Sequence, residues 1–445
     1  MNALPLRVAC AQVNPVAGDL EGNLGRILEA ARRAREAGAG ALLLPSMALP
    51  GGPAGDWLEQ PEFQGLARGA LARLAAGAGL TVVIGCECPG VSLITVQAGE
   101  IKLVAEGERA VVDVGGVRAG LMRGLDAGFA AALKEDGAQA LLASCSYRYS
   151  FGGRAAREAA LSGLGLPAAC VNLVGGEDAW VYDGASFAAG ADGKVRARLA
   201  SFEEDFAVFD LMDLPAQQPE AGNPGRELYA ALVLAVRDYV RKSGFSDVQI
   251  GLSGGVDSAL VAAIAADALG PEHVWCLMMP TRHTAGLSLT EAGRLAANLG
   301  VQYAVRPIAP ALEGFRALLA EDFAGLPRDV TEENLQARVR GVLLMAHANK
   351  FGRLVLATGN KSEGAAGYCT LYGDTVGAFA PIKDVLKTQV WALCRLRNAA
   401  AGRELIPEAI IGRAPSAELS DGQFDQQSLP PYEVLDAIVR QYVDE

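Results

Sequence analysis

Histidine, aromatic residues and positive charge are all scarce in this chain. Only 3 of its 445 residues are histidine, and Phe, Trp and Tyr together make up 6%. His273, His283 and His347 are scattered, so neither a Ser-His-Asp set nor a histidine metal site can be assembled from them. Lys and Arg number 39 against 51 Asp and Glu, and the net charge of −12 argues against a nucleic-acid-binding protein.

Long apolar runs and metal-type cysteine pairs are missing as well. No apolar stretch reaches the roughly 18–20 residues of a membrane span, and residues 1–13 lack the pattern of a signal peptide. The eight cysteines mostly lie in apolar, strand-like runs, which is typical of buried free thiols in a cytoplasmic protein. Cys86 and Cys88 form CxC without a nearby histidine, which is not a zinc spacing. We therefore expect a cytoplasmic protein that uses neither a membrane nor nucleic acid as partner.

Hydrophobic and glycine residues, in contrast, are abundant. The chain is 51% hydrophobic and contains 53 glycines, which excludes disorder and indicates many turns or close backbone approaches to a ligand. Residues 213–225 hold three prolines and no apolar periodicity, so they indicate a linker. We predict one α/β domain over 1–212 and a second over 226–445.

Both halves alternate short apolar runs with amphipathic helical patterns. In the first half the predicted strands are 6–13, 41–44, 81–85, 91–104, 117–122, 140–143 and 168–174, with a hairpin over 180–199 that turns at residues 192–193. In the second half the predicted strands are 248–252, 274–279, 302–308 and 354–358, and the predicted helices are 226–242, 259–269, 289–299 and 334–350. This βαβ alternation predicts a parallel sheet with helices on both faces.

One motif in the second half carries chemistry. It follows the predicted strand 248–252, opens the next helix, and consists of Ser253, Gly254, Gly255, Val256, Asp257 and Ser258. A glycine turn there presents backbone N–H groups at a helix N-terminus, two hydroxyls add donors, and Asp257 offers a carboxylate to Mg²⁺. The site suits a pyrophosphate. The alternative is an ordinary glycine-rich turn with serine N-caps, which could have the same sequence. It is neither a Walker motif nor a dinucleotide GxGxxG.

The motif resembles SGGxDS, the signature of the ATP pyrophosphatases, which cleave ATP to AMP and pyrophosphate while adenylating a substrate. Further segments resemble NAD⁺ synthetases in order and spacing over residues 225–445. They are TEENLQAR at 331–338, ATGNKSE at 357–363, GYCTLYGD at 367–374, PIKDV at 381–385 and PSAEL at 415–419.

The first half resembles the nitrilase-like glutaminase domain of the glutamine-dependent form. The matching segments are VACAQVNP at 8–15, GDLEGN at 18–23, NLVGG at 172–176, DGASF at 183–187 and FEED at 202–205. The resemblance implies an α/β fold in two parts: a nitrilase-like αββα sandwich, then a Rossmann-like ATP-pyrophosphatase sheet of the adenine nucleotide alpha hydrolase type.

The resemblance also implies an activity and a set of site residues. NAD⁺ synthetases amidate deamido-NAD to NAD⁺ through an adenylated intermediate, with ATP as co-substrate and Mg²⁺ as cofactor. Ser253, Asp257 and Ser258 would be catalytic, and Thr358, Lys387 and Ser416 would join the 253–258 loop in binding ATP and pyrophosphate. The resemblance further assigns Asn334, Arg338 and Glu363 to deamido-NAD, and Asp257 with Glu363 to the metal. Asn334 and Arg338 lie one helical turn apart and therefore share a face of the predicted helix. An alternative is that Glu363, Arg338 and Arg340 are solvated surface charges.

The glutaminase resemblance fails at its catalytic positions. An active domain of this type needs a Cys nucleophile, a Glu base and a Lys. Here the base position is Ser46 and the nucleophile position is Gly124, while the lysine stretch is absent and Lys102 has the wrong neighbours. We predict a pseudo-glutaminase and hence an NAD⁺ synthetase that takes free ammonia.

Other interpretations stay open. Cys145, just after a predicted strand, could replace the lost nucleophile, or the chain could be a nucleotide-binding regulator without activity. A different amide-forming ATP pyrophosphatase is a further alternative, which the motifs from 334 to 374 oppose. The family usually carries a further C-terminal segment with a Lys-Arg pair, so a natural short form and a trimmed chain are both open. The family resemblance finally implies a homo-oligomer, at least a dimer.

Overall fold

The structure, a computed structural model, describes residues 4–86, 91–163, 165–216 and 222–444. Cys88 and residues 217–221 of the predicted linker lie outside this described part. The chain divides into two compact units, Met1–Ala235 and Val236–Glu445, which are taken separately below. Among the described residues, none of the helices has the length and apolar character that crossing a membrane requires.

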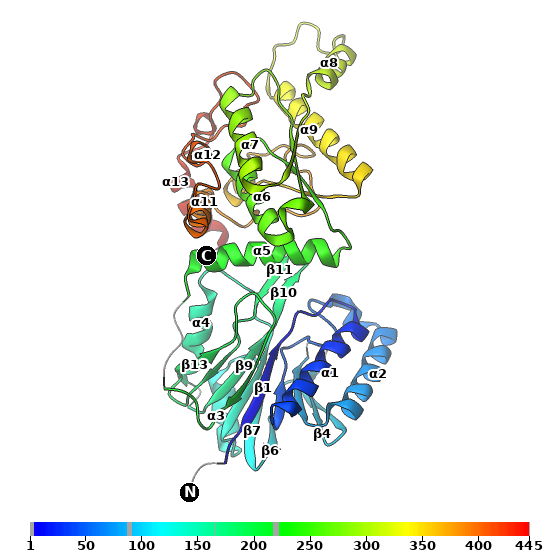
Figure 1. Ribbon diagram of the computed structural model, residues 1–445, viewed down its shortest axis with the longest axis vertical. Coiled ribbons are helices and arrows are strands. Elements are labelled where there is room, and N and C mark those ends of the chain that lie inside the picture. Colours follow the sequence, from blue (N-terminus) through cyan, green and yellow to red (C-terminus); the bar gives the residue numbers. More distant parts are fainter. Residues whose placement is uncertain (1–3, 87–90, 164, 217–221, 445) are drawn as a thin grey trace. The chain divides into compact units, whose positions relative to one another are not determined.

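Two six-stranded sheets form the first unit (Figure 1). In spatial order the first sheet holds β14 (Asp205–Asp210), β1 (Arg7–Gln12), β2 (Ala41–Leu43), β3 (Thr81–Gly85), β4 (Val91–Gln97) and β5 (Glu100–Ala105). The second holds β13 (Val195–Arg198), β12 (Phe187–Ala189), β9 (Ala168–Asn172), β8 (Ala140–Cys145), β7 (Val117–Arg123) and β6 (Ala110–Val114). Helices α1 (Leu20–Glu36) and α2 (Pro61–Ala78) cover the first sheet, and α3 (Ala127–Glu135) packs on the second.

Each central strand is apolar on both faces because both faces are covered. In β1, Val8 and Cys10 lie in the core between the two sheets, whereas Ala9 and Ala11 face the helices α1 and α2. A strand buried on both sides reads as a continuous apolar run instead of an alternating one. The predicted αββα sandwich is therefore confirmed.

One predicted pairing in this unit is wrong. The turn at residues 192–193 does join β12 to β13 in an antiparallel hairpin, as predicted. The earlier part of the predicted hairpin, β11 (Trp180–Asp183), pairs instead with β10 (Val174–Glu177) in a separate two-stranded sheet. A period-two pattern identifies a strand but not its partner, because pairing depends on which neighbouring backbone has free N–H and C=O groups.

The second unit contains a parallel sheet in the order β17-β16-β15-β18, which confirms the predicted Rossmann-like architecture. Its strands are β15 (Val248–Gly251), β16 (Val274–Met278), β17 (Gln302–Val305) and β18 (Leu354–Leu356). Helix α6 (Val256–Leu269) is apolar nearly all round, and 11 of its 14 residues are buried. Helices α7 (Gly286–Leu299) and α9 (Val330–Phe351) contribute further side chains to its core and to the site below.

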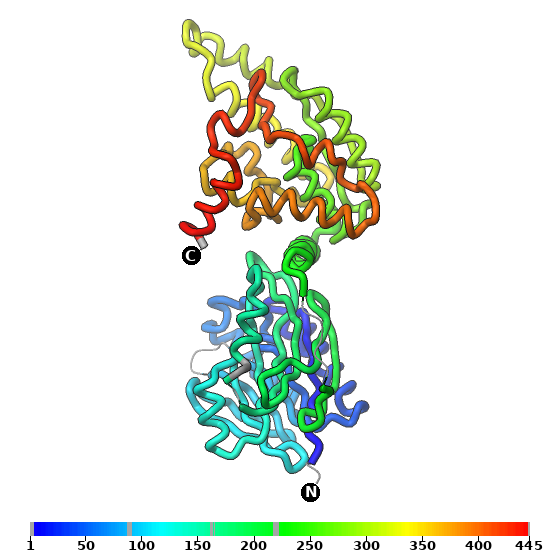
Figure 2. Tube along the Cα trace, turned by 90° about the vertical axis from the view of Figure 1, so that its left-hand side faces the viewer, coloured from blue at the N-terminus to red at the C-terminus, as the bar shows by residue number. Residues whose placement is uncertain are grey.

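Several helices of this unit escape the sequence patterns. They are α8 (Ala309–Leu318), α10 (Lys361–Ala366), α11 (Lys387–Ala401), α12 (Glu408–Ile411) and the C-terminal α13 (Tyr432–Val439). Most are short, and α10 depends on a capping box from Asn360 and Glu363 instead of an apolar stripe. Helix α13 packs against α10 and α11 (Figure 2). The helix α5 (Pro224–Lys242) begins two residues before its predicted start.

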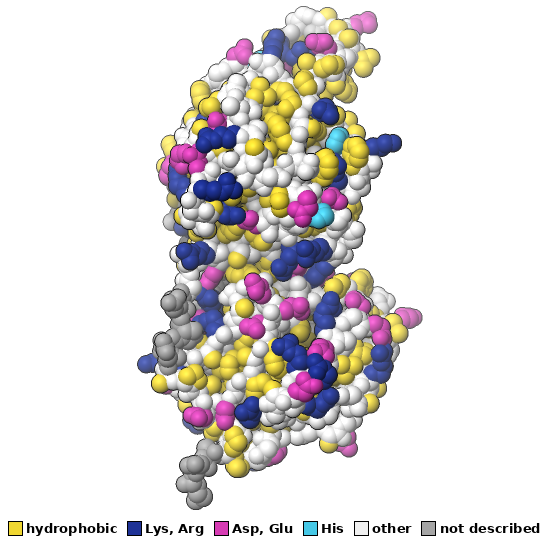
Figure 3. Space-filling view, viewed as in Figure 1, with side chains coloured by type: hydrophobic (Ala, Val, Ile, Leu, Met, Phe, Trp, Pro, Cys, Tyr) yellow, Lys and Arg dark blue, Asp and Glu magenta, His cyan; other side chains and the backbone are white. Residues whose placement is uncertain are grey.

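Charged side chains of both signs share the surface. On the face drawn in Figure 3, Lys and Arg are interspersed with Asp and Glu over the described residues. Such mixing keeps local potentials small. We therefore expect tight ligand binding in concave sites of the protein and not on this face.

Candidate active site

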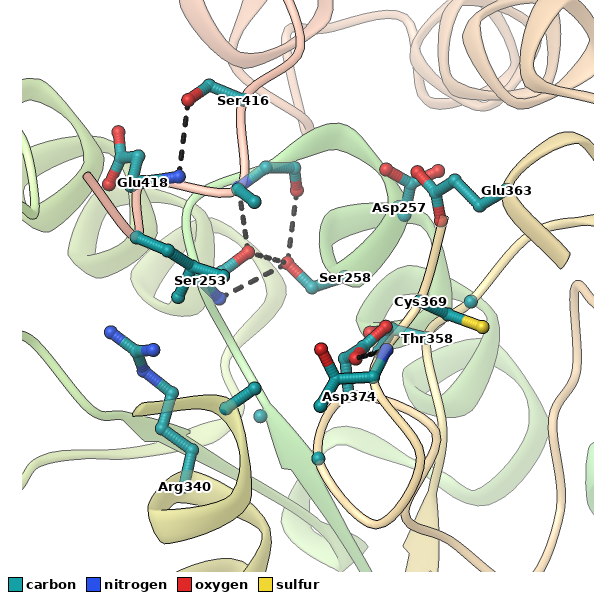
Figure 4. A pocket seen from close by; sticks show the side chains of 18 of the residues that line it. Ser253, Asp257, Ser258, Arg340, Thr358, Glu363, Cys369, Asp374, Ser416 and Glu418 are labelled. Atoms are coloured by element: carbon teal, nitrogen blue, oxygen red, sulfur yellow. Dashed lines mark hydrogen bonds between the residues drawn. The ribbon is translucent and has the colours of Figure 1, made fainter. Parts of the chain in front are cut away.

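The carboxyl ends of β15, β16 and β18 lead into a cavity of about 490 Å³ (Figure 4). All of its lining residues belong to the second unit, and they include the 253–258 loop, parts of helix α9, residues 356–359, Glu363, Lys387, and parts of the segments 367–376 and 410–425. Ligands of parallel α/β sheets bind outside the carboxyl ends of the strands, in pockets of about 300–1,000 Å³. The cavity is therefore the candidate active site.

The Ser-Gly-Gly-Val-Asp-Ser loop is held open by its own hydroxyl groups. The Oγ atoms of Ser253 and Ser258 lie 3.1 Å apart, and the Ser258 hydroxyl donates to the carbonyl oxygen of Gly255 at 3.0 Å. Gly254 has a φ of +84°, and a Cβ there would lie 2.6 Å from the backbone oxygen of Ser288 in α7. Only glycine fits this position, so the loop passes close to α7 and presents the first turn of α6 to the cavity.

Lys387 links the two carboxylates that the sequence assigns to a metal. Its Nζ donates to Oδ2 of Asp257 at 2.6 Å and to Oε1 of Glu363 at 3.1 Å. The Lys387 side chain is 2% exposed, and those of Asp257 and Glu363 are 17% and 18% exposed. The Nδ2 of Asn360 donates to the other Asp257 oxygen at 2.9 Å, so Asp257 is held on both oxygens.

Burial and charge shift the titration of this cluster. Burial, followed by the charge of Asp257, raises the pKa of Glu363, and Lys387 opposes the shift. Burial alone would lower the pKa of Lys387, but the charges of Asp257 and Glu363 outweigh it and raise that pKa above its ordinary value. The cluster is thus a cation held between two carboxylates that repel each other.

The donor set fits Mg²⁺ in part. Two partly exposed carboxylates supply the hard oxygen ligands that Mg²⁺ prefers. Within the part of the chain that the structure describes, no cluster of three or more His, Cys, Asp or Glu side chains could hold a metal ion. A Mg²⁺ held by Asp257 and Glu363 would take its other ligands from phosphates and water, as this ion commonly does.

The structure brings most of the other predicted residues to the cavity. Thr358, Ser416 and Asn334 line it, and Asn334 accepts a hydrogen bond from the Thr370 hydroxyl at 2.8 Å. Arg338 is exposed, does not line the cavity, and donates from Nε to the Leu371 carbonyl oxygen at 3.2 Å. The substrate roles that the sequence assigns to these four residues stay predictions.

Sequence reasoning missed the cation that does line the cavity from α9. The Nε of Arg340 donates to the carbonyl oxygen of Met279 at 3.0 Å, and burial lowers the pKa of Arg340 to about 10. Glu418 also lines the cavity and accepts from the Ser288 hydroxyl at 2.7 Å and from Arg413 Nη2 at 2.6 Å. The Ser288 bond attaches the 410–425 segment to α7, and the Arg413 bond lies within that segment. Helical periodicity distinguishes positions 338 and 340, but only the placement of α9 tells which one faces the cavity.

In the first unit, Ser46 and Gly124, the positions predicted to replace the glutaminase base and nucleophile, meet at one carbonyl. The Ser46 hydroxyl and the Gly124 amide donate to the carbonyl oxygen of Ser144, at 3.2 Å and 3.0 Å. Ser46 and Ser144 are 0% exposed, and a Cβ at Gly85 would collide with the Ser46 hydroxyl. Gly124 has a φ of +76°, and the Tyr147 hydroxyl closes over it. The space at Ser46 is therefore filled by close-packed strand ends.

Cys145 lies next to these positions but is not built as a nucleophile. It is 1% exposed, and its Sγ lies 3.2 Å from the Sγ of Cys170. Burial, with the Cys170 contact, raises the pKa of Cys145 well above the usual value of a thiol. A reactive cysteine needs the opposite environment, which lowers the pKa and exposes the sulfur.

Comparison with known proteins agrees with this two-part description. The NAD synthase family model matches residues 228–445, and the carbon-nitrogen hydrolase model matches residues 7–90. The chain is 41% identical to a glutamine-dependent NAD(+) synthetase of Xanthomonas campestris, over all of the chain and 88% of that protein. It is 38% identical to the protein of that name from Thermotoga maritima, over 99% of the chain and 89% of the relative.

Solved structures give the same result. The glutamine-dependent NAD⁺ synthetase of Acinetobacter baumannii, in complex with ADP, is 34% identical with a TM-score of 0.87, covering 99% of this chain and 88% of that one. The Cytophaga hutchinsonii enzyme, at 22% identity and a TM-score of 0.84 over 99% and 86% of the two chains, shares the fold. Together these likenesses define a nitrilase-like domain followed by an NAD synthase domain. The chain belongs to the glutamine-dependent NAD⁺ synthetase family, and it is an NAD synthetase.

Proposed function

We propose that this NAD synthetase amidates deamido-NAD to NAD⁺, cleaves ATP to AMP and pyrophosphate, and takes free ammonia as its nitrogen source. The relatives are named for glutamine. The ammonia proposal rests on which side chains the first unit has at two positions. Ser46 and Gly124 offer neither a base nor a nucleophile where the family resemblance requires them, and the space at Ser46 is packed shut.

The first chemical step forms an adenylate. A carboxylate oxygen of the nicotinate ring attacks the α-phosphorus of ATP, the bond from that phosphorus to the bridging oxygen breaks, and pyrophosphate leaves. Backbone N–H groups at the start of α6 and the hydroxyls of Ser253 and Ser258 surround the site for the leaving phosphates. Lys387 places a buried positive charge beside them. Mg²⁺, when bound, neutralises further charge on the phosphates.

The second step is amide formation. The nitrogen of ammonia attacks the acyl carbon, the bond from carbon to the AMP oxygen breaks, and the nitrogen gives up a proton. Asp374, whose pKa burial raises, lines the same cavity and is a candidate acceptor for that proton. The relative of known structure that binds ADP supports adenine nucleotide as the ligand of this cavity.

Nitrogen-source preference tests the proposal directly. Purified full-length protein is given deamido-NAD, ATP and Mg²⁺ with either NH₄Cl or ammonia-free glutamine, and NAD⁺ and pyrophosphate are measured. We expect NAD⁺ from NH₄Cl and none above background from glutamine. Equal or better use of glutamine would reject the ammonia proposal, and ATP binding without pyrophosphate release would instead indicate a regulatory, inactive nucleotide-binding protein.

Asp257→Ala tests the assigned site. The variant loses an oxygen ligand and one partner of Lys387, so we expect turnover to fall by about 10² or more, as when a residue that positions transition-state charge is removed. Asp267→Ala, at the other end of α6 and paired with Arg397 at 2.7 Å, is the matched control and is expected to keep its rate. An unchanged rate for Asp257→Ala would reject the assignment.

We further propose that the protein acts as a homo-oligomer, at least a dimer. Exposed apolar side chains on the second unit, including Leu318, Leu326 and Val330, support this proposal. Light scattering of the full chain at micromolar concentration measures the mass, and a monomer would reject it.

A further inference from the structure

Helix α13 holds the two residues that flank the Lys387 backbone in space, Ser362 and Thr388, through one buried carboxylate. Asp436 is 3% exposed and receives three donors: the Ser362 hydroxyl at 2.5 Å on Oδ1, and the Thr388 amide at 2.8 Å and hydroxyl at 2.7 Å on Oδ2. The Lys387 amide in turn donates to the Ser362 hydroxyl at 2.9 Å. Asp436 therefore joins the first turns of α10 and α11.

This arrangement supplies a cap that α11 does not have itself. The residue before α11 is Leu386, whose side chain makes no capping bond, so the first amides of the helix need partners from elsewhere. Ser362 and Asp436 take the amides of Lys387 and Thr388, and the negative charge of Asp436 lies at the positive end of the helix. The direction in which Lys387 leaves the helix is thus set from α13.

The same helix touches the far end of Lys387. The Lys387 Nζ lies 5.3 Å from the centre of the Tyr432 ring, and the Tyr432 hydroxyl donates to Asp425 at 2.7 Å. Asp425 lines the cavity. Helix α13 therefore reaches the Lys387 backbone through Ser362 and contacts its ammonium group through Tyr432, although neither Tyr432 nor Asp436 lines the cavity itself.

We infer that Asp436 is a positioning residue for ATP binding, which acts through Lys387. It holds α10 and α11 so that the Lys387 ammonium group stays beside Asp257 and Glu363 at the phosphate end of the cavity. The inference rests on the proposed function for the identity of the nucleotide. Helix α13 would thus affect nucleotide affinity although none of its residues lines the cavity.

Asp436→Asn is the decisive substitution. The three groups bonded to Asp436 all donate, so the NH₂ of an asparagine faces a donor whichever way it is turned; the bonds on that side and the negative charge at the start of α11 are lost. We expect the Kd of a non-hydrolysable ATP analogue, measured by calorimetry on the full chain, to rise about tenfold, since a hydrogen bond to a charged group is worth about that much. The KM for deamido-NAD should change less than the Kd of the ATP analogue, because two of its three predicted contacts, Asn334 and Arg338, lie on α9 and not on the helices that Asp436 joins. Glu433→Gln, on the exposed face of α13, is the matched control and should leave both values unchanged.

A double-mutant cycle with Lys387→Met separates positioning from a general loss of structure. If Asp436 acts through Lys387, Asp436→Asn changes the Kd by less than about twofold in the Lys387→Met background. An equal fold-change in both backgrounds, an unchanged Kd, or a wild type that does not bind the analogue would overturn the inference. Wild type that binds the analogue but makes no NAD⁺ would instead reject only the proposed function.

A milder variant covers the case in which Asp436→Asn does not fold. Thr388→Val removes one of the three donors and keeps the carboxylate, so the fold is expected to survive. We expect its Kd to rise about threefold in the wild-type background, less than for Asp436→Asn, because the carboxylate keeps its charge and two of its three donors. No rise, or a rise that persists in the Lys387→Met background, would contradict the inference in the same way.

Discussion

The ammonium nitrogen of Lys387 lies 2.6 Å from a carboxylate oxygen of Asp257, 130 residues away in the chain. This contact joins the first turn of α11 to the first turn of α6, which carries the Ser-Gly-Gly-Val-Asp-Ser loop. Glu363 completes the cluster from α10. Removing one member of a buried cluster of opposite charges leaves the others incompletely paired, which destabilises the fold. A substitution of each of the three side chains therefore has a measurable effect.

Lys387→Met should destabilise the fold in a pH-dependent way. Removing one partner of a buried ion pair costs about 3–5 kcal/mol, and we expect about 3 kcal/mol at pH 8 from urea unfolding. The folded-state pKa of Glu363 is raised from 4.5 to about 7 by burial and Asp257. The contribution of Glu363 to stability is therefore greatest below pH 4.5 and is lost as the pH rises through about 7. Loss of Lys387 raises this pKa further, so the deficit should be smaller at pH 5 than at pH 8.

Lys383→Met provides the matched control for that measurement. The side chains of Lys383 and its partner Asp384 are 52% and 76% exposed, so their ion pair contributes little. We expect no change in the free energy of unfolding at either pH. A Lys387→Met deficit that is equal at pH 5 and pH 8 would contradict the assigned coupling with Glu363.

Placing the residue types of a glutaminase, Glu at position 46 and Cys at position 124, should not allow the protein to use glutamine. Ser46→Glu places a carboxylate in a fully buried, close-packed position, so we expect a loss of more than about 3 kcal/mol in unfolding free energy. The variant Ser46→Glu with Gly124→Cys should form no NAD⁺ from glutamine. Ser46→Ala removes only one hydrogen bond and should cost about 1 kcal/mol. A stable double variant with glutaminase activity would show that the site is open in solution.

Arg340→Leu should separate stability from substrate binding. The Arg340 guanidinium is desolvated, and its Nε bond to Met279 is the one hydrogen bond that it makes within the described chain. Leucine removes this desolvation cost, so we expect an unchanged or higher Tm together with a KM at least about tenfold higher for one of the two anionic substrates. Arg338→Leu is the comparison. A larger rise in the KM for deamido-NAD in Arg338→Leu would favour the role that the family resemblance assigns to Arg338.

Thiol labelling should distinguish Cys369 from the other described cysteines. Cys369 is exposed and lines the cavity, whereas the other six described cysteines, Cys145 among them, are buried. Burial, with Asp374 and Glu363, raises the pKa of Cys369, so its labelling by a maleimide should be slow at pH 7 and faster at higher pH. In a Cys88→Ser background, ATP should protect Cys369. Faster labelling of Cys145 would revive it as a candidate nucleophile.

Local patterns predict much of the fold but not all of its pairings. The strand 81–85 is predicted at the bounds of β3 because a short β-branched run between glycines has few alternatives. Helix α10 is not predicted, since six residues capped by Asn360 and Glu363 carry no apolar period. The partner of β11 is not predicted either, because strand pairing is a non-local choice.

The sequence by itself determined the family and the presence of a phosphate-type loop at 253–258, and it places Ser and Gly at positions 46 and 124, where the family resemblance predicts a base and a nucleophile. These are properties of residue identity and spacing, and they need no coordinates. Only the tertiary structure decided that Arg340, and not Arg338, lines the cavity, and that Asp436 caps α11 from another helix. Both depend on how the helices pack. Packing brings together residues that are far apart in the chain, and no local sequence pattern shows which residues these will be.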